Sequence, residues 1–273
     1  MSATMTAAGL VLPMAEGESS HFPPTPGDFW QPLFAIPGTE YYFTRPMLLM
    51  AIATVILMVW LWMTTRQAAL VPGKGQWLTE QVYNFGRNGI ARDMIGSKEF
   101  MPFVPFLFSL FVFILLNNLM GIVPPFQNPT MARVAFPIGL TLLVYVVYHW
   151  VGLRKKGSIG AYLGGMLPSG LPGWIKPFIL LLELITFFIT RPLTLALRLF
   201  GNMFAGHMLL VVFIVGGWYL FKTYDPGLML VAIPAWILGV ALTAFEALVQ
   251  FLQAYVFTLL AASYIGGALA DEH

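Results

Sequence analysis

Five stretches of this sequence carry little or no charge, and each is long enough to cross a lipid bilayer. The three simplest cover residues 46–65, 101–119 and 134–153. A spanning α-helix needs about 20 mostly apolar residues. The composition agrees, because 58% of the residues are hydrophobic and only 10% are charged. We therefore predict an all-α polytopic membrane protein with about five transmembrane helices.

The last two apolar stretches, 177–221 and 226–270, are longer than one upright crossing requires. At 1.5 Å per residue, a helix of about 45 residues would be roughly 68 Å long. We therefore predict that each is strongly tilted, bent or split, and that the two form a hairpin.

The remaining segments predict shorter or less regular structure. Residues 76–99 place apolar side chains at roughly helical spacing with charges between them, which predicts an amphipathic helix on the membrane surface, although two glycines disfavour it. Residues 157–175 are rich in glycine and proline and predict a loop. Residues 1–45 predict an irregular extracytoplasmic tail that does not resemble a cleaved signal peptide. Residues 46–273 are then a single membrane domain.

Basic residues are distributed unequally between the two sides of the membrane. Nine flank the spans on one side and three on the other. Loops rich in lysine and arginine are usually cytoplasmic, so we predict an N-terminus outside and a C-terminus in the cytoplasm, which five crossings satisfy. The larger group is Arg66, Lys74, Arg87, Arg92, Lys98, Arg154, Lys155, Lys156 and Lys176, and the smaller is Arg45, Arg133 and Lys222.

The fourth apolar stretch carries two arginines at membrane depth. Arg191 and Arg198 are seven residues apart, so two helical turns bring them to one face, and Asn202 follows near that face. An arginine at the centre of a membrane helix costs about 2.5–3.5 kcal/mol on insertion scales. It cannot lose its proton to avoid that cost. A chain that keeps Arg198 among leucines therefore uses a fixed positive charge inside the membrane.

The fifth stretch carries an acidic polar face. Glu246 and Gln253 are seven residues apart, and Gln250 lies between them. If the two long segments pack antiparallel, this face and the arginine face oppose each other. Glu246 and His207 can both gain and lose protons in the physiological range once burial shifts them. Two titratable groups and one fixed charge suit proton transfer with a barrier in it.

Each of these residues also has a purely structural interpretation. Arg198 could form an ion pair with Glu183 or Glu246, and Arg191 could satisfy Glu183 or a carbonyl. His207 could be a packed core histidine. His149, near the end of the third span, is expected at the headgroup level. Asn118 could simply end its helix. The other amide side chains could form ordinary interhelical hydrogen bonds; these are Asn202, Gln250 and Gln253.

Several function classes find no support in the sequence. The net charge is only +2 and there is no cysteine, so neither nucleic-acid binding nor thiol chemistry is indicated. We find no phosphate loop, metal-spaced cluster or nucleophile triad, and so expect no cofactor and no metal. A secondary proton-coupled transporter remains an alternative, although such proteins often contain inverted repeats and none is found here. An intramembrane enzyme would need a nucleophile–base pair or metal ligands at depth, which the sequence does not offer.

Three motifs, in order along the chain, carry a family resemblance. They are Asn118-Leu-Met-Gly-Ile-Val-Pro124, Arg191-Pro-Leu-Thr-Leu-Ala-Leu-Arg-Leu-Phe-Gly-Asn-Met-Phe-Ala-Gly-His207, and Gln253-Ala-Tyr-Val-Phe-Thr-Leu-Leu-Ala-Ala-Ser-Tyr-Ile265. They resemble subunit a of F-type ATP synthases, and the resemblance extends from about residue 28 to the C-terminal helix.

The resemblance implies a stator subunit that is not an enzyme by itself and binds no nucleotide. It would work in a bacterial-type cell membrane beside a ring of small hairpin subunits, the c-ring, and b-type peripheral stalk subunits. Arg198 matches the family's essential arginine, which stands between two proton half-channels and faces each passing ring carboxylate. His207 and Glu246 match a pair in the outer half-channel. Three further residues match polar positions of the family that lie along the proton path or beside the essential arginine. They are Asn118, Asn202 and Gln253.

Two departures from the family pattern are visible. Some members have an aspartate at the position of Gly121, so an acidic group is missing there. Glu183 lies eight residues before Arg191, whereas some members have seven. Glu183, Arg191 and Gln250 are therefore secondary candidates for the proton path.

Overall fold

The computed structural model describes residues 32–35, 42–66, 69, 71–123, 129–165 and 172–270. Within these residues five helices are long and apolar enough to cross a membrane. They are α1 (Arg45–Thr65), η3 with α4 (Met101–Phe103 and Val104–Leu119), α5 (Ala135–Lys156), the segment Lys176–Lys222, and α9 (Pro226–Leu269). The predicted all-α polytopic membrane protein with about five spans is confirmed.

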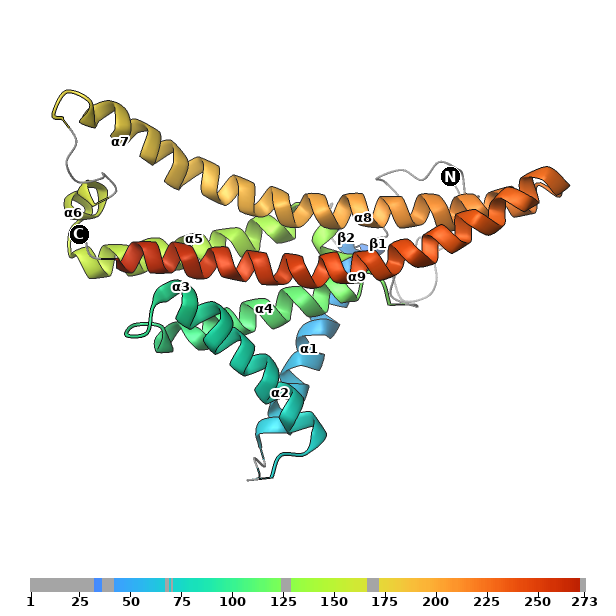
Figure 1. Ribbon diagram of the computed structural model, residues 1–273, viewed down its shortest axis with the longest axis horizontal. Helices are drawn as coiled ribbons and strands as arrows, with labels where there is room; N and C mark the ends of the chain where they lie inside the picture. The colour runs from blue at the N-terminus through green and yellow to red at the C-terminus, as the bar shows by residue number, and fades with distance from the viewer. Residues whose placement is uncertain are drawn as a thin grey trace. The chain divides into compact units, whose positions relative to one another are not determined.

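The last two spans are long continuous helices (Figure 1). α7 (Lys176–Ile185) runs through η5 (Thr186–Thr190) into α8 (Arg191–Lys222), for 47 residues in all, and α9 has 44. Near the turn that joins them, the Trp236 indole N–H donates to the Ile214 carbonyl at 3.3 Å, and Gly217 leaves room for the same ring. The hairpin is therefore present and neither helix is split. Its tilt in a membrane stays a prediction.

The expected surface helix is formed by α2 (Lys74–Asn84), η2 (Phe85–Arg92) and α3 (Asp93–Ile95). Its two glycines lie in η2, where the backbone takes up π-type bonding, and a Cβ added at Gly86 would lie 3.7 Å from the Phe108 ring. The helix ends at Gly96, whose φ of 96° is unfavourable for other residues. Its position on the membrane surface stays a prediction.

Two regions contain more structure than the sequence predicts. The expected loop 157–175 contains α6 (Ile159–Gly164), whose N-cap Ser158 accepts a hydrogen bond from the Ala161 N–H at 3.2 Å. The expected irregular tail contains the strands β1 (Pro32–Ala35) and β2 (Tyr42–Thr44), paired antiparallel. Such short elements depend on local hydrogen bonds, which periodicity does not detect. The rest of residues 1–41 lies outside the described residues, as do the predicted helix break at Pro124-Pro125 and the C-terminal residues 271–273.

The chain folds as two compact units, each built from several segments. The first contains the described residues up to Ile56, then Leu116–Ala132 with the short helix η4 (Thr130–Ala132), and Asn202–Phe251. The second contains Leu57–Leu115, Arg133–Gly201 and the described residues from Leu252 onward. Each unit has its own buried core: Met131 and Ala232 in the first, and Leu107, Leu199 and Ile265 in the second.

Candidate functional site

Arg198 lies on the exposed side of α8. Its neighbours Leu195 and Leu199 are 2% and 0% exposed and point inward, whereas Arg198 is exposed. Asn202, four residues further along the helix, is also exposed. Charged side chains inside a membrane face protein or water rather than lipid. An exposed arginine on a membrane-spanning helix therefore requires water or another protein over this face.

Arg191 is held by aromatic rings. Its guanidinium lies 3.5 Å from the centre of the Phe187 ring and 5.2 Å from that of Tyr264, both within cation–π range. In the part of the chain that the structure describes, Glu183 forms no ion pair with either arginine. The ion-pair interpretation that involves Glu183 is therefore not supported.

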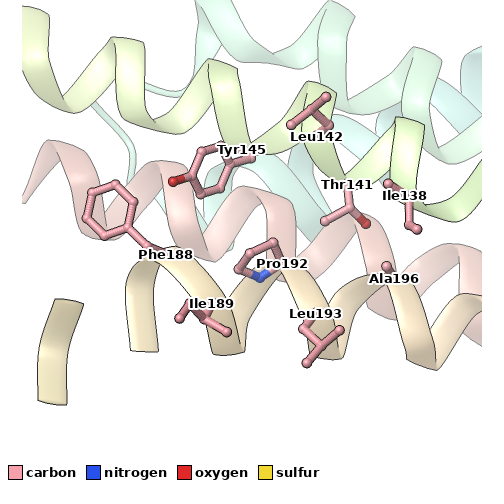
Figure 2. Close-up of a pocket in the computed structure, with 9 residues that line it drawn as sticks. All are labelled: Ile138, Thr141, Leu142, Tyr145, Phe188, Ile189, Pro192, Leu193 and Ala196. Atoms are coloured by element: carbon pink, nitrogen blue, oxygen red, sulfur yellow. The ribbon is translucent and has the colours of Figure 1, made fainter. Parts of the chain in front are cut away.

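A different face of the same helix packs towards α5. An apolar groove of about 480 Å³ lies between α5 and the η5–α8 segment, as Figure 2 shows. Thr141 and Tyr145 line it from α5, and Pro192 and Ala196 line it from α8. Ala196 and Arg198 are two residues apart, so their side chains point in nearly opposite directions. The groove and the arginine face are therefore separate surfaces of α8.

A buried histidine lies at the cytoplasmic end of α5, by the predicted topology. His149 Nδ1 is 2.7 Å from the Tyr162 hydroxyl, and its ring stacks on Phe188 with centres 4.9 Å apart. Burial raises the pKa of Tyr162 to about 12. This phenol therefore keeps its proton at neutral pH and can donate it to Nδ1. The expected position of His149 at the headgroup level is not tested, but its burial against α6 was not predictable from the sequence.

Glu246 belongs to a buried polar cluster of the first unit. Its Oε1 accepts a 3.2 Å hydrogen bond from Gln250 Nε2, and Asn118 Nδ2 donates to the Gln250 backbone carbonyl at 3.4 Å. Glu246 is 5% exposed, and Gln250 and Asn118 are 0% exposed. Glu246 Oε2 has no hydrogen-bond partner among the described residues. One carboxyl oxygen is thus fixed, and the other is available to hold a proton.

His207 is buried and lines a groove of the same unit. The groove has a volume of about 230 Å³, and Gly121, Ile122 and Thr243 also line it. The residue before His207 is Gly206, where an added Cβ would come within 3.2 Å of Glu246 Oε1. The Glu246 carboxyl therefore packs on α8 one residue away from His207.

Gly121 lies in close contact with its surroundings. A Cβ added there would come 3.0 Å from Pro129 Cβ and 3.1 Å from the Asn118 carbonyl oxygen. A side chain at this position would therefore require Pro129 to move. Gly121 lines the same groove as His207.

The predicted site residues are divided between the two units. Gln253 is 4% exposed and lies on α9 in the second unit. The second unit also contains Glu183, Arg191 and Arg198, and the first contains Asn118, Asn202, His207, Glu246 and Gln250. The described residues include no group of three or more metal-ligating side chains of the His, Cys, Asp or Glu types.

Three tyrosines at or near these residues, Tyr148, Tyr162 and Tyr264, were not predicted from the sequence. Tyr264 falls within the C-terminal motif, and this was a signal that could have been used. Tyr148 and Tyr162 had no such signal, because aromatic residues are common in membrane spans and at their ends.

Comparison with known proteins decides the family. The sequence model of the family described as ATP synthase A chain matches residues 47–266. The chain belongs to this family. It is 42% identical to ATP synthase subunit a of a Nocardioides species, over 98% of this chain and 100% of that protein. It is 39% identical to ATP synthase subunit a of Pseudarthrobacter chlorophenolicus, over 97% of this chain and 99% of that protein.

The match covers every candidate residue named above. Asn118, the segment from Glu183 to His207, and the segment from Glu246 to Gln253 all lie between residues 47 and 266. The family's members are membrane-sector components of an ATP synthase rather than its catalytic subunits. The chain is accordingly an integral membrane protein, and the resemblance identified from three motifs is confirmed.

Proposed function

We propose that this chain is the stationary subunit that passes protons to and from the carboxylates of a rotating c-ring. The observation that carries the proposal is Arg198, a permanently charged side chain exposed on a membrane-spanning helix. Covering it with lipid would be costly. A ring that presents a carboxylate to this face at each step would compensate the charge.

In this role Arg198 separates two proton half-channels. It favours the ionised form of the carboxylate that faces it, because an opposite charge nearby stabilises the charged state. It also repels a proton that would cross directly from one half-channel to the other. Each proton that moves through 100 mV releases about 2.3 kcal/mol, so ATP synthesis needs several protons, and a leak here would lose that energy.

The first unit supplies the outer half-channel in this proposal. Glu246 and His207 exchange protons, and the groove at His207 gives water access. The Gln250 side-chain amide donates to the Glu246 carboxyl, and Asn118 donates to the Gln250 backbone carbonyl. Along the remaining path the polar groups are Asn202 and Gln253.

The topology and partners follow from the same proposal. The N-terminus is outside, the C-terminus is cytoplasmic, and the complex lies in a bacterial-type cell membrane. The partners are the c-ring proteolipids, b-type peripheral stalk subunits and the lipid bilayer. No observation favours the transporter or the intramembrane enzyme. Purification in mild detergent distinguishes them, because co-elution with very small ring proteolipids is expected here and a lone monomer or dimer is expected for a transporter.

The decisive test is proton flux in membrane vesicles that carry Arg198→Ala. We expect ATP-driven proton pumping to be lost while passive proton leak under an imposed gradient is retained or increased. Arg154→Ala is the matched control, because it removes an arginine from the end of α5 and should leave both fluxes unchanged. Normal pumping in Arg198→Ala would make this residue structural and would contradict the proposal.

A further inference from the structure

The helix that carries both arginines contains a π-turn. Between α7 and α8, η5 uses hydrogen bonds that span five residues, so that the Arg191 N–H donates to the Thr186 carbonyl. The Thr190 hydroxyl donates to the Ile185 carbonyl at 3.5 Å, which helps to satisfy the loosened turn. Such turns take one extra residue and are frequent at functional sites.

One carbonyl of this turn receives no donor from the backbone positions that would normally supply it. The Arg191 N–H is used by Thr186, and the next residue is Pro192, which has no N–H. The Phe187 carbonyl is therefore left over. The Tyr148 hydroxyl donates to it at 3.0 Å from α5, and Tyr148 itself is only 2% exposed. A partly buried carbonyl without a donor costs free energy, so the hydrogen bond from Tyr148 stabilises the π-turn.

The π-turn determines which face of the helix Glu183 occupies. Glu183 and Arg191 are eight residues apart, and in an uninterrupted α-helix this spacing would rotate one from the other by roughly 80°. Because the turn takes one extra residue without advancing the face, eight residues here correspond to seven in an α-helix, which is about two turns. Glu183 is thereby brought to the face that Arg191 and Arg198 share.

We propose that Tyr148 is a positioning residue for proton transfer. Its hydrogen bond to the Phe187 carbonyl holds the π-turn, and the π-turn keeps Glu183 in line with Arg191 and Arg198. This inference rests on the proposed function, because it places a carboxylate on the proton-conducting face towards the cytoplasmic end of the helix. Without the π-turn the same sequence would direct Glu183 to another side of the helix.

The test uses deletion of Ile189 from the turn, which converts eight residues into seven. A continuous α-helix then gives Glu183 and Arg191 a common face without any help from Tyr148. We expect Tyr148→Phe to reduce ATP-driven pumping on the order of tenfold, as for one unpartnered buried carbonyl. The Ile189 deletion should keep pumping within about twofold of the unaltered complex. Adding Tyr148→Phe to the deletion should lower pumping much less than Tyr148→Phe does alone. Pro192 still leaves the Phe187 carbonyl without a backbone donor, but the common face no longer depends on the π-turn.

Tyr145→Phe is the matched control, because it removes a hydroxyl from the same helix without touching the Phe187 carbonyl. The amount of assembled complex is measured for every variant. Loss of pumping or of assembly in the Ile189 deletion would overturn the inference. So would a loss in the double variant, relative to the deletion, as large as the loss that Tyr148→Phe causes alone. These outcomes differ from failure of the proposed function, in which the unaltered complex itself would not pump protons when supplied with ATP.

Discussion

Glu246 and Arg198 have opposite surroundings, although both are charged or chargeable residues on membrane-spanning helices. Glu246 is buried, and an amide of the same helix donates a hydrogen bond to it. Arg198 is exposed. The Glu246 carboxyl thus has a hydrogen-bond donor within this chain. The exposed Arg198 guanidinium instead requires water or a group of another protein to compensate its charge. This difference is expected if one is part of a channel and the other faces a moving partner.

The two units also hold their functional residues by different means. In the first unit the Gln250 side-chain amide donates a hydrogen bond to the Glu246 carboxyl, and Asn118 donates one to the Gln250 backbone carbonyl. In the second, close contact of rings and small residues fixes α5, with the Tyr162 ring packed against Gly152 and the Phe188 ring stacked on His149. Changes of polarity should therefore damage the first unit most, and changes of volume the second.

The largest expected effect is from Glu246→Gln, which removes the titratable group and keeps the shape. We expect the rate of ATP synthesis to fall on the order of tenfold or more, as for the loss of a proton-transferring group. Passive leak should not rise, unlike in Arg198→Ala. The measurement is ATP synthesis and leak in the same vesicles. Unchanged synthesis in both Glu246→Gln and His207→Ala would count against the pairing of these residues.

The next largest effect is a loss of stability in the first unit when a buried side chain loses its polar group but keeps its volume. Gln250→Leu keeps the approximate size of a fully buried side chain but removes the donor to Glu246. We expect a loss of about 1–3 kcal/mol, the usual cost of leaving a buried polar group unpaired. Thermal unfolding of the detergent-solubilised complex measures it. The exposed Gln81→Leu is the control, and equal melting temperatures for the two variants would refute the expectation.

Gly152→Ala tests the second unit by volume alone. An added Cβ would collide with the Tyr162 ring and come 3.3 Å from Ala268 Cβ. We expect a loss of about 1–3 kcal/mol from overpacking. Gly139→Ala, on the same helix with nothing within 4 Å of its added Cβ, should be neutral or stabilising. If both variants melt at the same temperature, close packing does not hold α5 and α6 together.

The smallest expected effect is from Tyr162→Phe. Loss of the hydrogen bond to His149 should cost about 0.5–1.5 kcal/mol. Burial raises the pKa of Tyr162 from 10.0 to about 12, so its contribution to stability is complete below pH 10 and is lost as the pH rises through 12. Melting temperatures over this pH range should therefore fall less steeply in the variant. An identical slope in both proteins would contradict the assigned environment.

The spans were predictable because each depends on a local property, namely a run of apolar residues long enough for the bilayer. Predicted limits such as 101–119 agree with the observed helix for that reason. The helix α6 was not predictable, because six residues give too little periodicity. The π-turn before Arg191 was not predictable either. Pro192 has no N–H to donate to this turn, and the donor to the Phe187 carbonyl is the Tyr148 hydroxyl of another helix, α5.

The sequence by itself determined the class of protein, the number of spans and the family, because these depend on composition, charge and motifs along the chain. Only the tertiary structure decided which side of each helix the polar groups occupy. The eight-residue spacing from Glu183 to Arg191 illustrates the difference. In the sequence this spacing is a departure from the pattern of the resembled family. In the structure a π-turn lies between the two residues, and Tyr148 donates a hydrogen bond to one of its carbonyls. We infer that this turn returns Glu183 to the face of Arg191 and Arg198. A hydrogen bond between residues 39 positions apart produces this result, and no local pattern contains it.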